Sequence, residues 1–185
     1  ILHNIRRNPD LVHLVHDNQI YGLTKGQASP TTGEDMVTDI QPEGVNAEPF
    51  HPLSFALGMK AGFVARAFVG ESEHLKKIIK AAFEHRGYAL VDILQPCVSF
   101  NKINTYQWYQ DRVYKLDEDY DETDYTTAVE KAQEWGDKIP LGIFYKKEKE
   151  VFRDRFSQLE AETSLLEKRA DTEKRKEILN DFVSK

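Results

Sequence analysis

Short apolar runs alternate with an amphipathic segment along the first half of the chain. The runs at residues 11–15, 62–69 and 88–94 have the length and the branched or aromatic side chains that are typical of buried strands. Between the second and third runs, residues 71–86 repeat apolar side chains at helical spacing, and Gly87 ends the helix. This strand–helix–strand order predicts a parallel sheet with a right-handed crossover.

The predicted helix at residues 71–86 has one apolar side, which we expect in the core. We expect His74 and His85 to be solvated. In the preceding strand Arg66 stands out, because a buried arginine needs a partner; a place at an exposed strand end is the alternative. The apolar side of the helix consists of Leu75, Ile78, Ile79, Ala82 and Phe83.

The remaining segments carry weaker patterns. Residues 32–57 have no clear period and contain several prolines, which predicts an extended loop. Residues 104–112 and 125–135 are predicted helices, and residues 139–145 are a short apolar extended piece. Residues 149–185 are strongly charged with apolar side chains at helical spacing, which indicates one or two amphipathic helices that dock on this subunit or on a partner.

Composition places the chain among globular proteins. Its 185 residues suit one domain with an appendage, and 40% hydrophobic residues are enough for a core. The net charge of −6 argues against a general nucleic-acid binder. No apolar run approaches the roughly 18 residues of a membrane span. A single cysteine rules out an internal disulfide and no secretory signal is visible, so we expect a cytoplasmic protein without a membrane or nucleic-acid partner.

A polar, glycine-containing segment, which we call the 17–31 loop, follows the first predicted strand. Open α/β sheets bind ligands at the carboxyl ends of their strands. Asn18 offers a neutral oxygen to a hard cation such as Mg²⁺, and Gly22 and Gly26 allow backbone amides to approach phosphate oxygens. Thr24 adds a hydroxyl group and Lys25 a positive charge. The chemistry suits a diphosphate with its metal; a plain surface loop is the alternative.

Three sequence blocks, at residues 18–31, 96–101 and 104–109, resemble the β subunits of 2-oxoacid:ferredoxin oxidoreductases. The resemblance covers most of residues 1–148 and implies a thiamine-diphosphate-binding α/β fold, with a mostly parallel sheet flanked by helices and a C-terminal helical extension. It further implies that the Asn18 side chain and the Ile20 carbonyl bind Mg²⁺. The diphosphate would lie on Gly22, Leu23 and Thr24.

Cys97 is the single thiol of the chain, and it follows the predicted strand at residues 88–94. We therefore expect it at the same carboxyl edge of the sheet as Asn18. A lone cysteine is usually a small buried hydrophobic residue. The resemblance instead implies that Cys97 is one ligand of a [4Fe–4S] cluster, whose other ligands belong to an N-terminal region that precedes Ile1 in the family. That region also carries a Gly-Asp-Gly segment of the thiamine site, so we expect the chain to be N-terminally truncated.

These patterns and the resemblance divide the chain into three parts. Residues 1–100 form the C-terminal part of the thiamine-diphosphate-binding domain, residues 101–148 a family-specific segment, and residues 149–185 a charged helical tail. By resemblance the enzyme converts a 2-oxoacid and coenzyme A to an acyl-CoA and reduces ferredoxin, together with an α subunit that supplies the activating glutamate. We therefore assign no catalytic acid or base to this chain.

Lys25 is the candidate substrate-binding residue, since its ammonium group can reach a carboxylate of the 2-oxoacid. Family members often carry glycine at this position, which fits a role in the choice of substrate. The sequence leaves pyruvate, 2-oxoglutarate and branched-chain oxoacids open. Two alternative functions remain at this point: another thiamine-dependent decarboxylase or transketolase-like subunit without a cluster, and a non-catalytic interaction module.

Overall fold

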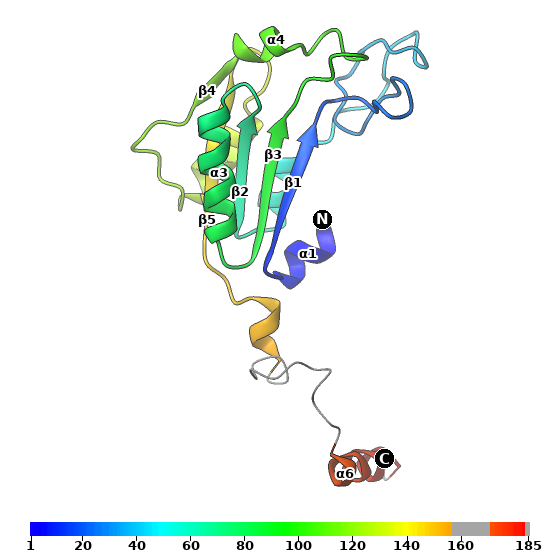
Figure 1. The fold of residues 1–185 in the computed structure, drawn as a ribbon, viewed down its shortest axis with the longest axis vertical. Helices are drawn as coiled ribbons and strands as arrows, with labels where there is room; N and C mark the ends of the chain where they lie inside the picture. The colour runs from blue at the N-terminus through cyan, green and yellow to red at the C-terminus, as the bar shows by residue number, and fades with distance from the viewer. Residues whose placement is uncertain (157–170, 184–185) are drawn as a thin grey trace. The chain divides into compact units, whose positions relative to one another are not determined.

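The computed structural model describes residues 1–156 and 171–183. The chain divides into two compact units, Ile1–Phe152 and Arg153–Lys185. In the first unit, all of which is described, five strands form one sheet in the order β1-β3-β2-β5-β4 (Figure 1). The strands are β1 (Leu11–Asp17), β2 (Phe63–Phe68), β3 (Tyr88–Leu94), β4 (Val113–Lys115) and β5 (Ile139–Lys146).

The strand pairing confirms the predicted, mostly parallel sheet. β3 lies between β1 and β2 and is parallel to both. β5 pairs with β2 in the antiparallel direction, and the short strand β4, which the sequence pattern did not reveal, runs parallel to β5. β4 and β5 thus belong to the same sheet as the first three strands.

Helices cover both faces of this sheet (Figure 1). On one face, α3 (Ser72–Glu84) packs against β2 and β3. The opposite face is covered by α1 (Leu2–Arg7), α2 (Pro52–Gly58) and α5 (Tyr125–Gln133). The short helix α4 (Tyr106–Gln110) packs near the carboxyl end of β2, where its Tyr109 contacts Phe68. The predicted α/β fold class is therefore confirmed.

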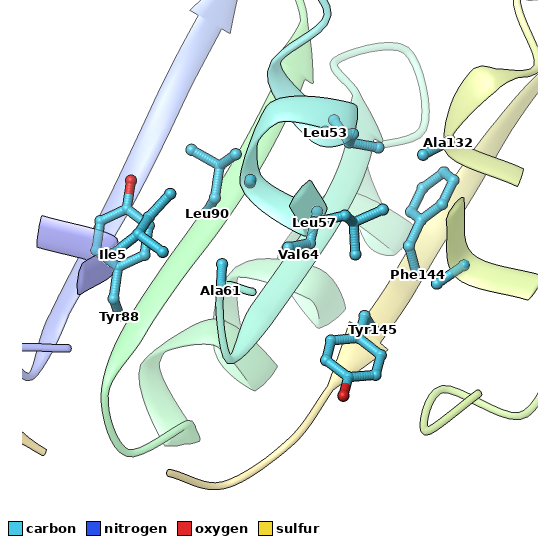
Figure 2. Packing of buried hydrophobic residues seen from close by; sticks show 12 residues of the cluster. Ile5, Leu53, Leu57, Ala61, Val64, Tyr88, Leu90, Ala132, Phe144 and Tyr145 are labelled. Carbon is cyan, nitrogen blue, oxygen red and sulfur yellow. The ribbon is translucent and has the colours of Figure 1, made fainter. Parts of the chain in front are cut away.

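Side chains on the α2 and α5 face of the sheet form one large buried cluster. Figure 2 shows Leu53 and Leu57 of α2 packed between Leu90 of β3 and Phe144 of β5. Alternate residues of β2 and β3 point to the other face, where they meet α3. Because both faces of these strands are covered, their sequences read as continuous apolar runs.

The structure corrects one predicted loop and the predicted exposure of three side chains, those of Phe83, His74 and His85. Residues 52–58 form a helix inside the segment predicted as a loop; the run is too short for a clear period, but Pro52 suits the first helical position. Phe83 is 69% exposed, whereas its neighbour Ala82 is buried. Successive residues of a helix are rotated by about 100°, so the Phe83 side chain points away from the buried side of the helix. His85 is buried against the Phe63 ring and His74 is half-buried, so neither is solvated as predicted.

The second unit is described in part. A short 3₁₀ helix spans Phe152–Arg155, and α6 spans Thr172–Val183. The predicted helical turns at Leu159, Leu165 and Leu166 lie outside the described residues. In α6 the apolar side chains Ile178, Leu179 and Phe182 are exposed. Among the helices described, none is both long and apolar enough to cross a membrane.

Candidate functional site at the carboxyl edge of the sheet

The carboxyl ends of β1 and β3 lie next to each other. Asp17, the last residue of β1, pairs in register with Leu94, the last residue of β3, and the Gln95 amide donates a hydrogen bond of 2.8 Å to the Asp17 carbonyl. The 17–31 loop and the segment that contains Cys97 therefore leave the same edge of the sheet side by side. This is the placement that the strand order predicted.

Hydrogen bonds at its base close the 17–31 loop. The Asp17 Oδ1 atom accepts the Gln19 amide at 3.1 Å and the Thr31 hydroxyl at 2.6 Å. The buried Thr32 hydroxyl donates to the Gln19 carbonyl at 2.6 Å and accepts the Ser29 amide at 2.8 Å. Both ends of the loop are thus fixed to β1, and its tip extends from a rigid base.

The first turn of the loop contains the predicted metal ligands. Asn18 Oδ1 accepts the Ile20 amide at 3.1 Å, so the side chain and the next two residues form one tight turn. An amide oxygen has a second lone pair, which this hydrogen bond leaves available for a cation. Asn18 and the Ile20 carbonyl are close in the chain and held by the same turn, which fits two adjacent ligands of a magnesium ion.

Residues 21–27 form the tip of the loop. The Tyr21 amide donates to the Gln27 carbonyl at 2.7 Å, and the Gly26 amide donates to the Tyr21 carbonyl at 2.9 Å. Leu23 is 98% exposed, and its neighbours Thr24 and Lys25 are exposed as well. The predicted diphosphate-binding residues therefore lie at an accessible surface, and their roles stay predictions.

Lys25 has a left-handed backbone with φ of 67°. Glycine adopts this conformation without the steric cost that a side chain brings. The glycine that the family resemblance implies at this position therefore has a backbone explanation, in addition to a choice of substrate.

Cys97 begins a turn directly beside the 17–31 loop. A Cβ atom at Gly22 would lie 3.8 Å from Cys97 Sγ, and one at Gly26 would lie 3.3 Å from the Phe100 ring. The Asn101 side-chain amide donates to the Asn18 carbonyl at 3.2 Å. These contacts join the two predicted cofactor segments into one site.

The surroundings of the Cys97 thiol favour its ionised form. Partial burial raises the pKa of the thiol, but hydrogen bonds from the backbone amides of residues 99–101 and the charge of Lys102 lower it more, so the net pKa is below its ordinary value. A thiolate is the form that binds iron, and amide hydrogen bonds to sulfur are a feature of iron–sulfur sites. Within the described residues, no three His, Cys, Asp or Glu side chains gather closely enough to hold a metal ion. The lowered pKa and the amide hydrogen bonds of the Cys97 sulfur fit the role of one cluster ligand.

Beneath the loop lies a buried charged group of side chains that the sequence revealed only in part. Arg66 was recognised as needing a partner, and that partner is Asp92, whose Oδ2 atom lies 3.4 Å from Arg66 Nε. The pKa of Asp92 is raised to about 7, mainly by burial and also by the negative charge of Asp17, while the charge and hydrogen bond of Arg66 act to lower it. Burial also raises the pKa of Asp17. The alternative of an exposed Arg66 is wrong, since 2% of the residue is exposed.

Comparisons with known proteins agree with this geometry. Residues 1–93 match the family model of the C-terminal TPP-binding domain of thiamine pyrophosphate enzymes, and residues 97–161 match that of the C-terminal part of the pyruvate ferredoxin oxidoreductase β subunit. The fold and the loop at the carboxyl edge thus define a thiamine pyrophosphate-binding domain. The chain belongs to the β subunits of 2-oxoacid:ferredoxin oxidoreductases, which confirms the resemblance seen in the sequence.

Individual relatives support the same family. The chain is 44% identical over 154 residues to the 2-oxoacid:ferredoxin oxidoreductase subunit beta of a Sulfolobus species, with 77% of this chain and 50% of the relative covered. It is 41% identical over 165 residues to subunit beta of 2-oxoacid:ferredoxin oxidoreductase 1 from Aeropyrum pernix, covering 83% and 52%. The chain thus spans about half the length of these curated relatives.

A solved structure is similar over nearly the whole chain. This is the 2-oxoglutarate:ferredoxin oxidoreductase from Magnetococcus marinus with 2-oxoglutarate, coenzyme A and succinyl-CoA bound. The TM-score is 0.83 at 35% sequence identity, and the match covers 97% of this chain and 60% of the other.

The closed base of the loop gives a direct prediction. Thr32→Val keeps the side-chain shape but leaves the Gln19 carbonyl and the Ser29 amide without their hydroxyl partner. We expect the free energy of unfolding to fall by about 1–3 kcal/mol, as is usual for unsatisfied buried polar groups. Chemical denaturation measures this loss, and hydrogen exchange should show faster exchange at the Ser29 amide. The matched control is Thr123→Val, whose hydroxyl makes an exposed hydrogen bond; equal losses in both variants would contradict a fixed loop base.

Proposed function

We propose that this chain holds the diphosphate and the metal of thiamine diphosphate in the β subunit of a 2-oxoacid:ferredoxin oxidoreductase. The enzyme oxidatively decarboxylates a 2-oxoacid, joins the acyl group to coenzyme A and passes the electrons to ferredoxin. The observation that carries this proposal is the closed 17–31 loop beside Cys97 at one edge of the sheet. The predicted cofactor loop and the predicted cluster ligand Cys97 are thus neighbours at this edge.

In the proposed site the Asn18 side chain and the Ile20 carbonyl bind Mg²⁺, and Gly22, Leu23 and Thr24 contact the diphosphate. When bound, the thiazolium ring supplies the carbanion chemistry of decarboxylation. The contribution of this chain is to hold the diphosphate end in place, since the loop base is fixed by Asp17 and Thr32. The rest of the cofactor site and the catalytic glutamate are expected outside this chain, the glutamate on an α subunit.

Cys97 would supply one thiolate ligand to a [4Fe–4S] cluster that accepts electrons and passes them on to ferredoxin. Its position next to Gly22 supports this role, because the cluster would then lie beside the diphosphate loop. The amides around the sulfur supply the hydrogen bonds that stabilise a thiolate ligand. This feature favours the cluster-containing class over a thiamine enzyme without a cluster.

The test of the proposed function is the metal ligand itself. Asn18→Leu, made in the full-length subunit of the assembled enzyme, removes the neutral oxygen that the site offers to Mg²⁺. The dissociation constant for thiamine diphosphate at fixed Mg²⁺, measured by calorimetry, should rise about 100-fold or more, since even the loss of an outer-shell partner costs 10–100-fold. Asn46→Leu, on the exposed part of residues 41–50, is the matched control and should bind normally. Unchanged affinity in Asn18→Leu would rule out this metal site.

Cys97→Ala tests the cluster. The full-length variant should lose iron and the optical signal of one [4Fe–4S] cluster, because a thiolate ligand is missing. Thiamine diphosphate affinity should remain, since the loop is closed by residues other than Cys97. A variant with its full iron content would show that Cys97 is a packing residue.

Lys25 is proposed to attract a carboxylate of the substrate. Its left-handed backbone makes asparagine the suitable replacement, because Lys25→Asn removes the charge and tolerates a positive φ. Steady-state kinetics with pyruvate and with 2-oxoglutarate should show a raised Michaelis constant for at least one substrate, with thiamine diphosphate affinity retained. The control is Lys60→Asn, an exposed lysine with φ of 59° outside the 17–31 loop. If Lys25→Asn and Lys60→Asn have the same constants as the parent enzyme, Lys25 takes no part in substrate binding.

A further inference from the structure

Three charged side chains from neighbouring strands lie on one face of the sheet below the 17–31 loop. Arg66 of β2 and Asp92 of β3 are opposite each other in the strand register, and Asp17 ends β1 on the other side of β3. Arg66 and Asp92 are 2% and 1% exposed. A buried charge needs compensation by partners, so the positions of these groups depend on one another.

The three groups line one small cavity together. Its volume is about 30 Å³, and Asp17, Arg66 and Asp92 line it together with the loop residues Gln19 and Thr31. This volume suits one or two water molecules, which need several polar partners, and it is too small for an oxoacid or a phosphate. Among the residues that the structure describes, Arg66 Nη1 and Asp92 Oδ1 are buried without a hydrogen-bond partner.

The guanidinium group of Arg66 is fixed in orientation by its surroundings. Its Cζ atom lies 5.3 Å from the centre of the Trp135 ring and 5.6 Å from that of Phe144, within the range of cation–π attraction. With Nε directed to Asp92, the group is held on several sides, and Nη1 remains for the cavity. The Nη1 group of Arg66 is therefore a hydrogen-bond donor held in place below Asp17, the residue that closes the 17–31 loop.

We infer that Arg66 is a positioning residue for the cofactor loop: water in this cavity links Arg66 Nη1 and Asp92 Oδ1 to Asp17. Asp17 in turn accepts the Gln19 amide and the Thr31 hydroxyl. Arg66 thereby sets the place of the turn that contains Asn18 without touching the cofactor itself. This inference rests on the proposed function of the loop.

A purely structural ion pair is the competing explanation, and the two differ in what a double substitution restores. Arg66→Met leaves the Asp92 carboxylate buried without its counter-charge, which lowers stability in either case. Arg66→Met/Asp92→Val removes both charges and restores stability. If the pair is purely structural, the double variant should regain its affinity for thiamine diphosphate together with its stability. If Arg66 positions the loop, the double variant should regain stability but still bind thiamine diphosphate weakly.

The experiment uses the full-length subunit in the assembled enzyme, freed of thiamine diphosphate. The melting temperature and the dissociation constant for thiamine diphosphate at saturating Mg²⁺ are measured for both variants. We expect the double variant to regain the parent melting temperature and to keep a dissociation constant raised about 10- to 100-fold, the usual effect of losing an outer-shell partner. Arg112→Met is the matched control, since the guanidinium of Arg112 packs on Trp108 at 4.5 Å and does not line the cavity.

Parent affinity in the double variant would overturn the inference and leave a structural ion pair. This result would not touch the proposed function, because the parent enzyme and Arg112→Met would still bind thiamine diphosphate. Failure of the parent enzyme to bind the cofactor would instead reject the proposed function, and the inference with it. If Arg66→Met alone does not assemble, the double variant still decides between the two explanations.

Discussion

The site depends on the closure of the 17–31 loop by Asp17. A single carboxylate oxygen at the end of β1 accepts both an amide at the start of the loop and a hydroxyl at its end. This closure is possible because β1 is held beside β3, in a register that ends both strands at the same edge. The accessible tip at residues 21–27 is thus presented from a base that the sheet itself holds in place.

The closure has an electrostatic cost. Asp17 and Asp92 are both buried carboxylates, and burial raises the pKa of each. Arg66 offsets part of this cost with one positive charge, which packs against the Trp135 and Phe144 rings. Apolar side chains of similar volume in place of these charged groups would often give an equally stable protein. The three buried charged side chains under the 17–31 loop are explained if their geometry positions that loop.

The sequence predicted the parts of the fold that have strong local signals. The apolar runs of β1, β2 and β3 and the helix between the last two were clear, and their parallel pairing followed from chain order. The same reasoning placed Asn18 and Cys97 at one edge, and contacts at Gly22 and Asn101 agree. The family resemblance supplied the assignment of roles, which local patterns alone left open.

Other features depend on tertiary contacts that no local pattern contains. Helix α2 is too short for a visible period, and the burial of Leu53 and Leu57 depends on β3 and β5. His85 is buried because the chain turns back to begin β3, although it lies just beyond a solvent-facing end of α3. Arg66 signalled a need for a partner, but Asp92 became identifiable as that partner only from the strand register. The role of Asp17 likewise required the position of Thr31.

The central claim is that the 17–31 loop binds the metal and diphosphate of thiamine diphosphate. A crystal structure of the assembled enzyme with thiamine diphosphate and Mg²⁺ tests it most directly. The account predicts a Mg²⁺ ion about 2.0–2.1 Å from both Asn18 Oδ1 and the Ile20 carbonyl oxygen, with the diphosphate against residues 22–24. A Mg²⁺ ion bound entirely by residues outside the 17–31 loop would contradict it.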